Sequence, residues 1–270
     1  MATKAPAKAA AKKPGTAMTV WEKKMADAAE KQAKQEKPMA GFLNISTQGG
    51  VLSIDGNEVG DSINGVVLCA AYENAYYGGE PFDPDNPKPP VCYAFGDLDA
   101  DDPEDTMAPA KDLPGKVADK CSDCEFNVMG SAETGRGKAC KNIRRLAVVT
   151  EDAIKSADAM SEAEVRLLKV PVTSVRNWSG YVRGVLTDEL SRPYWSVVTE
   201  ISIKRDKKTQ FKLNFEHAEN IDFDDKLFAA LEAQQKKVRP LIVAPYPVPE
   251  EDEKPAKAAP KKGAKYAARR

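Results

Sequence analysis

The spacing of hydrophobic and polar residues along the chain predicts an α+β protein dominated by β-strands. Six segments show the period-two alternation or the continuous apolar run that is typical of strands, with turn residues between them. They cover residues 41–47, 51–59, 64–77, 145–150, 165–171 and 194–215. The run at 64–77 is apolar enough to indicate a central strand, and the pattern at 194–215 indicates a hairpin.

Helical periodicity marks two further segments of the predicted domain. Residues 173–190 place apolar residues, including Trp178, on one face after a cap at Thr173 or Ser174. Residues 223–238 have the pattern of an amphipathic helix that closes the domain. We expect Trp178 to pack into the core rather than to face a ligand.

Composition divides the chain into one domain between two tails. Residues 1–40 are a Lys- and Ala-rich tail that includes a marginal helix over 19–37, and residues 249–270 are a charged tail. Both tails bury too little apolar surface to fold alone, so we expect disorder there. We expect residues 41–248 to form a single β-dominated OB-like barrel with two or three helices and an inserted loop at about 91–145.

Four of the five cysteines lie in that loop and suggest what holds it. Cys121 and Cys124 form a CxxC pair, with Cys140 after them and Cys92 before them. A long loop without periodicity needs internal support, and a tight turn can bring two thiolates onto one tetrahedral metal ion. We therefore predict a structural Zn²⁺ held by these four cysteines. The alternatives are free thiols or a redox-active CxxC, whereas Cys69 is expected to be a buried strand thiol.

Charge and motifs narrow the class of protein. The formal net charge is -1, from 40 basic and 41 acidic residues, so the average charge indicates no particular partner. No apolar run approaches the roughly 20 residues of a membrane span, and the N-terminus has no secretory signal. We expect a soluble protein of a bacterial host cytoplasm. With His217 as the single histidine and no metal-hydrolase motif, we expect no enzyme activity.

Glycines and basic residues alternate around the last predicted zinc ligand, and aromatic residues precede them in the sequence. Glycine allows a backbone to approach phosphate, cations neutralise the phosphate, and aromatic rings stack on unpaired bases. We predict nucleic-acid contacts from Arg136, Lys138, Lys141, Arg144, Arg145, Tyr72, Tyr76, Tyr77, Tyr93 and Phe95. The alternative is that the aromatic residues belong to the core and the cations form a solvated face.

The segment at 91–146 carries a Cys, then CxxCxxNxxGS, then GxGKACK and a basic RRL strand. The matching positions are Cys92, Cys121, Cys124, Asn127, Gly130, Ser131, Gly135, Gly137, Lys138, Ala139, Cys140, Lys141, Arg144, Arg145 and Leu146. This pattern resembles a family of zinc-knuckle proteins of tailed phages. The similarity continues through residues 167–182 and 197–203, so that it covers about half the chain. The chain departs from the family pattern at Glu125, where Pro is usual, and at Met129, where a large aromatic residue is usual.

The resemblance implies a non-sequence-specific single-stranded DNA-binding protein that acts in phage DNA replication or recombination. The expected partners are single-stranded DNA and, through the charged tails, replication or recombination proteins, with no membrane. Two alternatives remain open. One is a structural virion or assembly protein, and the other is a factor that binds a host protein through an acidic loop. Each alternative would use the zinc site for structure alone.

Overall fold

The computed structural model describes residue 25 and residues 43–47, 50–54, 56–78, 88–133 and 136–246. Apart from Met25 and Leu43, these residues belong to one compact unit, Asn44–Arg270. The predicted disordered tails at 1–40 and 249–270 lie outside the described residues, except for Met25, which is helical and exposed.

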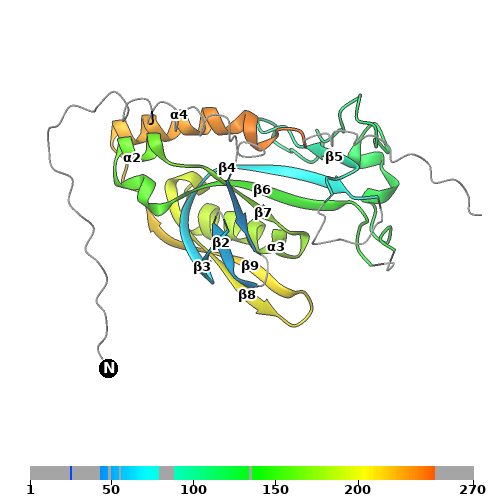
Figure 1. Ribbon diagram of the computed structural model, residues 1–270, viewed down its shortest axis with the longest axis horizontal. Helices are drawn as coiled ribbons and strands as arrows, with labels where there is room; N and C mark the ends of the chain where they lie inside the picture. The colour runs from blue at the N-terminus through cyan, green and yellow to red at the C-terminus, as the bar shows by residue number, and fades with distance from the viewer. Residues whose placement is uncertain are drawn as a thin grey trace, which may run out of the picture. The chain divides into compact units, whose positions relative to one another are not determined.

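Nine strands form one sheet (Figure 1), and the pairings whose register the structure describes are antiparallel. The strands are β1 Leu43–Ser46, β2 Leu52–Ile54, β3 Asn57–Gly60, β4 Ser62–Tyr76, β5 Cys92–Phe95, β6 Lys141–Thr150, β7 Arg166–Val170, β8 Val197–Asp206 and β9 Gln210–Asn220. Neighbours follow the order β3-β2-β1-β7-β6-β4-β8-β9, and β5 pairs with β4 outside this path. The expected sheet-dominated mixed class is therefore confirmed.

Strand β4 is the central strand that its apolar run predicts. One edge pairs with β6 along almost its whole length. The other edge is shared, because β8 pairs with its beginning and β5 with its end. Within the described residues the path of strands ends at β3 and at β9 without closing. The predicted OB-like barrel is therefore wrong in this respect, since no pairing among the described residues joins the two ends of the path.

The helices follow the sequence pattern with shifted ends. The structure describes α2 Ala157–Glu162, α3 Val172–Gly180, the π-helical segment η5 Tyr181–Glu189 that continues α3, and α4 Asp225–Ile242. The predicted cap of α3 is wrong: the helix begins after Pro171, and Ser174 is buried. Its Oγ instead accepts a hydrogen bond from the backbone N–H of Leu213 in β9, at 2.9 Å.

Helix α4 extends beyond its predicted end at residue 238 and passes through Pro240 to Ile242. Proline is tolerated this close to the end because few backbone bonds remain to be lost. At the other end Asp224 caps the helix and accepts a hydrogen bond from the N–H of Leu227 at 2.7 Å. This extension carries the end of α4 toward β5 and so shapes the candidate site.

The two longer helices cover opposite faces of the sheet. Trp178 and Tyr181, from α3 and η5, pack with Leu146 and other apolar residues of the strands in the main core. On the other face, Gln235 of α4 donates a hydrogen bond to the carbonyl of Leu68 in β4 at 3.0 Å. Figure 1 shows α4 along one side of β4 and β6 with α3 on the other side. The core position expected for Trp178 is confirmed.

Candidate nucleic-acid interface

Side chains of β4 and β6 alternate between two faces of the sheet, and the two faces differ in chemistry. Tyr72 pairs with Arg144, and Ala71 pairs with Arg145. Successive residues of a strand point to opposite sides, so the two neighbouring arginines point apart. The α3-side face carries Tyr72, Asn74, Tyr76, Asn142 and Arg144, and the α4-side face carries Glu73, Ala75, Lys141, Ile143 and Arg145.

The predicted zinc ligands lie around the end of the sheet that β4 and β5 form. Cys92 begins β5 opposite Tyr76, Cys121 begins a short 3₁₀ turn, and Cys140 immediately precedes β6. Cys124 is half-buried and the other three are buried. Cys69, expected to be a buried strand thiol, lies inside β4 and is buried.

The predicted zinc site is not supported and is corrected here. Among the described residues, which include all five cysteines, no group of three or more His, Cys, Asp or Glu side chains is placed to hold a metal ion. Burial, followed by the charges that Cys121, Cys124 and Cys92 would carry, raises the pKa of Cys140 to about 12.

Hydrogen bonds within the cysteine loop fix its outline. The side-chain amide of Asn127 donates to the carbonyl of Cys121 at 2.9 Å, and Lys138 Nζ donates to Asn127 Oδ1 at 3.1 Å. The N–H of Cys140 donates to the carbonyl of Phe126 at 2.9 Å. The described residues of this loop, which has no periodicity in the sequence, are thus held in place by hydrogen bonds, one of which comes from Lys138.

Arg144 serves the structure of the α3-side face. Its side chain is almost completely buried, and its guanidinium lies 3.3 Å from the centre of the Tyr72 ring. Its Nη2 pairs with Glu104 Oε1 at 3.2 Å. A cation held over a ring in this way is attracted to the π face. Arg144 and Tyr72 were both predicted to contact nucleic acid, but in the structure they contact each other.

Arg145 serves the opposite face through a buried ion pair. Its Nε and Nη2 donate to the two carboxylate oxygens of Glu73 at 2.6 and 3.2 Å, and Glu73 is fully buried. Its Nη1 donates to the carbonyl of Ile242 at the end of α4, at 3.1 Å. The arginine thus ties the sheet to α4, and it is a structural cation rather than a free one.

Tyr246 completes this buried network. Its hydroxyl donates to Glu73 and accepts a hydrogen bond from Lys169 Nζ at 2.9 Å. Burial, and next the negative charge of Glu73, raise the pKa of Tyr246 well above the usual range. Burial and the same carboxylate also raise the pKa of Tyr77. The network holds the chain that follows α4 against β5.

Three predicted contacts remain together on the α4-side face. The register places Tyr93 of β5, Ala75 of β4 and Lys141 of β6 in one row across the sheet. In the next row Phe95 of β5 lies opposite Glu73. Lys141 is exposed, and the two rings of β5 are half-buried. An aromatic edge strand and an accessible cation therefore share one face.

Of the remaining predicted contacts, the side chain of Tyr77 is accessible to solvent, whereas the ring of Tyr76 packs on another ring of the protein. Tyr77 follows β4 and is 39% exposed. The ring of Tyr76 stacks on Phe126, with centroids 4.3 Å apart and planes at 11°. Arg136 is exposed and makes contacts within the protein. The sequence therefore grouped residues that the fold distributes over two faces and a loop.

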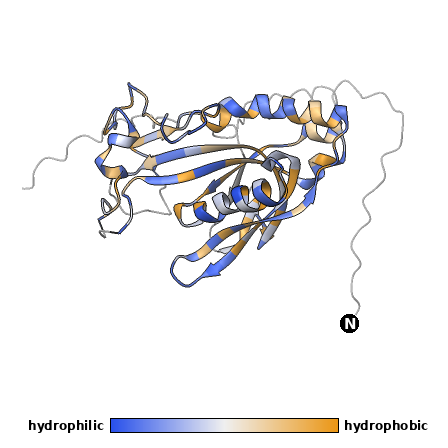
Figure 2. Ribbon diagram, turned by 180° about the vertical axis from the view of Figure 1, so that it is seen from behind, coloured by the Kyte–Doolittle hydropathy of each residue, from blue (hydrophilic) through white to orange (hydrophobic). Residues whose placement is uncertain are grey.

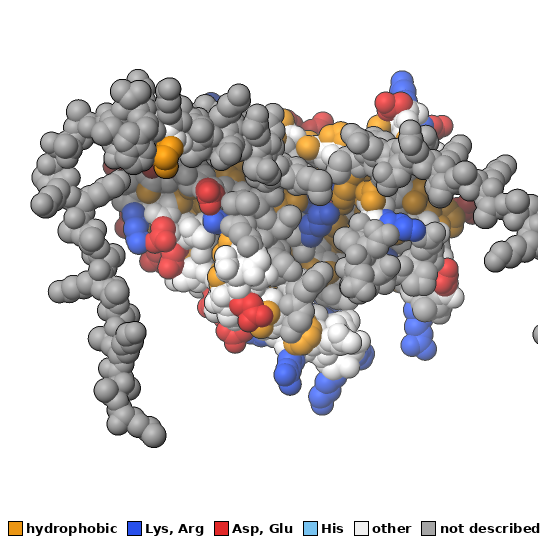
Figure 3. Space-filling view, in the orientation of Figure 1, with side chains coloured by type: hydrophobic (Ala, Val, Ile, Leu, Met, Phe, Trp, Pro, Cys, Tyr) orange, Lys and Arg blue, Asp and Glu red, His pale blue; other side chains and the backbone are white. Residues whose placement is uncertain are grey.

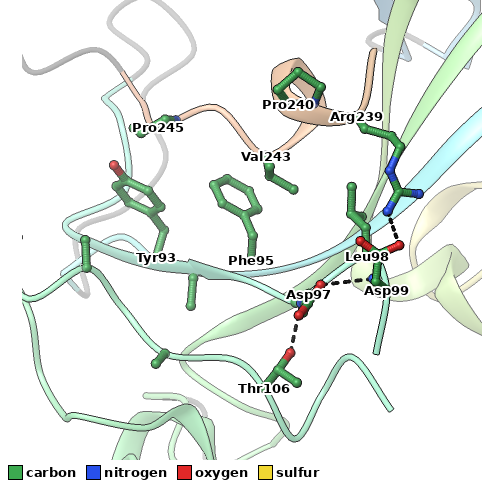
Figure 4. A pocket seen from close by; sticks show the side chains of 14 residues that line it. Tyr93, Phe95, Asp97, Leu98, Asp99, Thr106, Arg239, Pro240, Val243 and Pro245 are labelled. Carbon is green, nitrogen blue, oxygen red and sulfur yellow. Dashed lines mark hydrogen bonds and ion pairs between the residues drawn. The ribbon is translucent and has the colours of Figure 1, made fainter. Parts of the chain in front are cut away.

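A groove runs along β5 on the α4-side face, and we call it the β5 groove. Its volume is about 560 Å³. Figure 4 shows the rings of Tyr93 and Phe95 rising from β5 toward Val243, with Pro240 and Pro245 above them. Pro240, Val243 and Pro245 lie far from β5 along the chain and carry no local sequence signal for a site, so they were not among the predicted contacts.

Acidic residues form one side of the β5 groove. Asp97 and Asp99 line it, and Asp99 pairs with Arg239 of α4. The loop is ordered by its own side chains: Asp97 Oδ1 accepts from the N–H of Asp99 at 3.0 Å, and Thr106 Oγ1 accepts from the N–H of Asp97 at 2.8 Å. The groove therefore combines an aromatic floor with a carboxylate rim.

A second group of cations lies at the end of the β8–β9 hairpin. Arg205, Lys207 and Lys208 are exposed, and in the part of the chain that the structure describes none of them makes an ion pair. The hydrophilic colouring of Figure 2 and the Lys and Arg side chains of Figure 3 mark this hairpin end. The pattern at residues 194–215 predicted the hairpin but no binding role for it, although its run of basic residues was a usable signal.

No family model, no curated protein and no solved structure matches this chain. Among the described residues, no helix has the length and apolar character needed to span a membrane.

Proposed function

We propose that this protein binds single-stranded DNA without reading its sequence, on the α4-side face of the sheet. The observation that carries the proposal is the row in which Tyr93 of β5 and the exposed Lys141 of β6 flank β4, with Phe95 beside Tyr93. Every base has a face that can stack on a ring, and every nucleotide has a phosphate, so such a surface suits an unpaired strand.

In this proposal, bases stack on Tyr93, Phe95 and the exposed ring of Tyr77. Phosphates are neutralised by Lys141, which is exposed, and by Lys169, whose ammonium group also donates to the hydroxyl of Tyr246. Because the cations contact phosphates rather than base edges, binding releases counterions and has no sequence preference. The order of the cysteine loop matters because it positions the beginning of β6, where Lys141 lies.

The wider setting comes from the resemblance of residues 91–146 to single-stranded DNA-binding proteins of tailed phages. We propose that the protein acts in phage DNA replication or recombination. A closed barrel is not required for this role. An open sheet face that displays aromatic residues of adjacent strands offers the same kind of stacking surface that OB folds use.

The test is a titration of fluorescein-labelled oligo-dT with the purified full chain, followed by anisotropy at about 50 and 200 mM salt, the range in which phosphate contacts lose most of their strength. We expect saturable binding that weakens steeply with salt. A mixed-sequence oligonucleotide of the same length is expected to bind with similar affinity, because no base edge is read.

Variants assign the binding to the α4-side face. Tyr77→Ala is expected to lower affinity roughly 5- to 150-fold, which corresponds to one lost stacking contact of about 1–3 kcal/mol. Its matched control is Phe228→Ala, because Phe228 is 37% exposed, against 39% for Tyr77. Lys141→Gln is expected to weaken binding and reduce the salt slope by about one, and Lys155→Gln serves as its control.

Two results would overturn the proposal. One is the absence of saturable oligo-dT binding at the lower salt concentration by protein with a native circular dichroism spectrum. The other is an equal loss of affinity in the Phe228→Ala and Lys155→Gln controls, which would place the DNA elsewhere.

A further inference from the structure

The β5 groove has an acidic rim beside its aromatic floor, because Asp97 and Asp99 line it. The sequence between residues 96 and 110 has no Lys or Arg, and its acidic residues are Asp97, Asp99, Asp101, Asp102, Glu104 and Asp105. Asp99 and Glu104 are neutralised by Arg239 and Arg144. Asp101 and Asp105 do not line the groove, but they lie in the same loop as the lining residues Asp99 and Thr106. Both are exposed, and within the described residues neither makes an ion pair.

The floor of the groove is apolar and aromatic. It is lined by Tyr93 and Phe95 from β5 and by Pro240, Val243 and Pro245 from the end of α4 and the chain after it. An aromatic side chain between cations would contact the apolar floor through its ring and the acidic rim through the cations. The groove thus fits a basic peptide segment with one aromatic anchor.

The chain itself contains a segment of this chemistry, connected directly to the groove. The described chain reaches the groove at Pro245, and the ring of Tyr246 packs edge-on against Tyr93 with centroids 5.0 Å apart. Beyond this point, residues 254–270 contain no acidic residue and a single aromatic one, Tyr266. Their cations are Lys254, Lys257, Lys261, Lys262, Lys265, Arg269 and Arg270.

The length of the connection permits contact. Twenty residues lead from Tyr246 to Tyr266, and a chain of that length spans up to about 70 Å when extended. Tethering also raises the effective concentration of the segment at the groove compared with a separate peptide. The segment of the same chain therefore has an advantage over any partner of equal affinity.

We propose that residues 262–270 of this chain dock in its own β5 groove. In this arrangement Tyr266 packs on Tyr93 and Phe95, and the neighbouring cations face Asp101 and Asp105. The contact forms without DNA and does not depend on the proposed function. One consequence does rest on that function: the segment and a DNA strand would compete for the aromatic floor.

The test uses the full chain with the photoreactive substitution Tyr266→p-benzoylphenylalanine, irradiated without DNA and mapped by mass spectrometry. We expect cross-links to residues 93–110 and 239–245. An equal mixture of ¹⁴N- and ¹⁵N-labelled protein at low micromolar concentration separates the two sources of a cross-link, because contact within one chain yields no mixed-isotope product. The cross-link yield is expected to fall several-fold at about 1 M salt, where the Debye length is roughly 3 Å.

Charge variants give the matched comparison. The double variant Asp101→Lys/Asp105→Lys is expected to lower the cross-link yield several-fold, since it replaces attraction by repulsion. The control is Glu219→Lys/Asp222→Lys, which makes the same charge change at exposed positions around the end of β9. This control is expected to retain the wild-type yield.

Three outcomes would overturn the inference in folded protein. They are cross-links that avoid the groove, cross-links formed mainly between isotopically different chains, and equal yields in the two charge variants. Mixed-isotope cross-links would assign the groove to a second copy of the chain. Each of these results leaves the oligo-dT titration unaffected, so failure of this inference and failure of the proposed function are distinguishable.

Discussion

The two faces of the β4–β6 ladder use the same kind of residue for different purposes. Arg144 and Arg145 are neighbours in sequence and equally buried. Arg144 lies on the ring of Tyr72 and pairs with Glu104, whose side chain is 63% exposed. Arg145 pairs with Glu73, whose side chain is 0% exposed. Water can therefore solvate Glu104 if Arg144 is lost, whereas it cannot reach Glu73 if Arg145 is lost.

This difference shows that burial of a cation does not by itself indicate how much the fold depends on it. The cost of losing an ion-pair partner is set by the environment of the group left behind. On the α3-side face that group remains hydrated, whereas on the α4-side face a buried carboxylate would remain. The two faces also differ in what holds them together. Backbone and amide hydrogen bonds organise the α3-side face, whereas a buried ionic network organises the α4-side face.

The largest expected effect comes from breaking the network on the α4-side face. Arg145→Met is expected to lower the free energy of unfolding by about 3–5 kcal/mol, because Glu73 would be left buried without its cation. Guanidinium denaturation measures this loss. Arg144→Met is expected to cost about 1 kcal/mol, mainly the contact with Tyr72. Equal losses in the two variants would remove the distinction between the faces.

The next effect concerns the attachment of the chain after α4. Tyr246→Phe deletes a hydroxyl that donates to Glu73 and is expected to cost about 1.5–3 kcal/mol, since the bond is to a charged group. Denaturation midpoints give the change. Tyr194→Phe is a suitable comparison because it also removes a hydroxyl from a half-buried tyrosine, outside this network. A smaller loss for Tyr246→Phe than for Tyr194→Phe would contradict the network.

A pH titration sharpens the same comparison. A tyrosine in the unfolded chain ionises near pH 10, whereas burial and Glu73 raise the pKa of Tyr246 in the folded protein. Above pH 10 the unfolded chain therefore loses a proton that the folded chain keeps, and stability falls as the pH rises. Denaturation between pH 8 and 11 measures the slope, and Tyr246→Phe should flatten it. An unchanged slope in that variant would contradict the assignment.

The smallest effect is expected on the α3-side face. Asn127→Ala removes a hydrogen bond to the carbonyl of Cys121 and an acceptor for Lys138, each worth roughly 0.5–1.5 kcal/mol. Amide hydrogen exchange of the cysteine loop measures the change. In this variant we expect the backbone amide of Cys140 to exchange faster than the backbone amides of β4. Exchange that is unchanged at Cys140 would show that this amide does not hold the loop.

The sequence alone determined the elements whose patterns are local. The apolar run of β4, the alternation in β8 and β9, and the periodicity of α3 and α4 were visible because side-chain period follows directly from backbone geometry. The core position of Trp178 and the burial of Cys69 follow from the same patterns. The aromatic and basic residues of the candidate interface could also be picked out by type.

Only the tertiary structure decided how those residues are grouped. Strand β5 and the first residues of β6, which the sequence suggested were irregular, are strands because β4 offers both of its edges for pairing. That pairing sends Arg144 and Arg145 to opposite faces, brings Pro245 to β5, and leaves the thiols without a metal-binding arrangement among the described residues. Contacts between residues far apart in sequence leave no trace in local periodicity, so no window along the chain could reveal them.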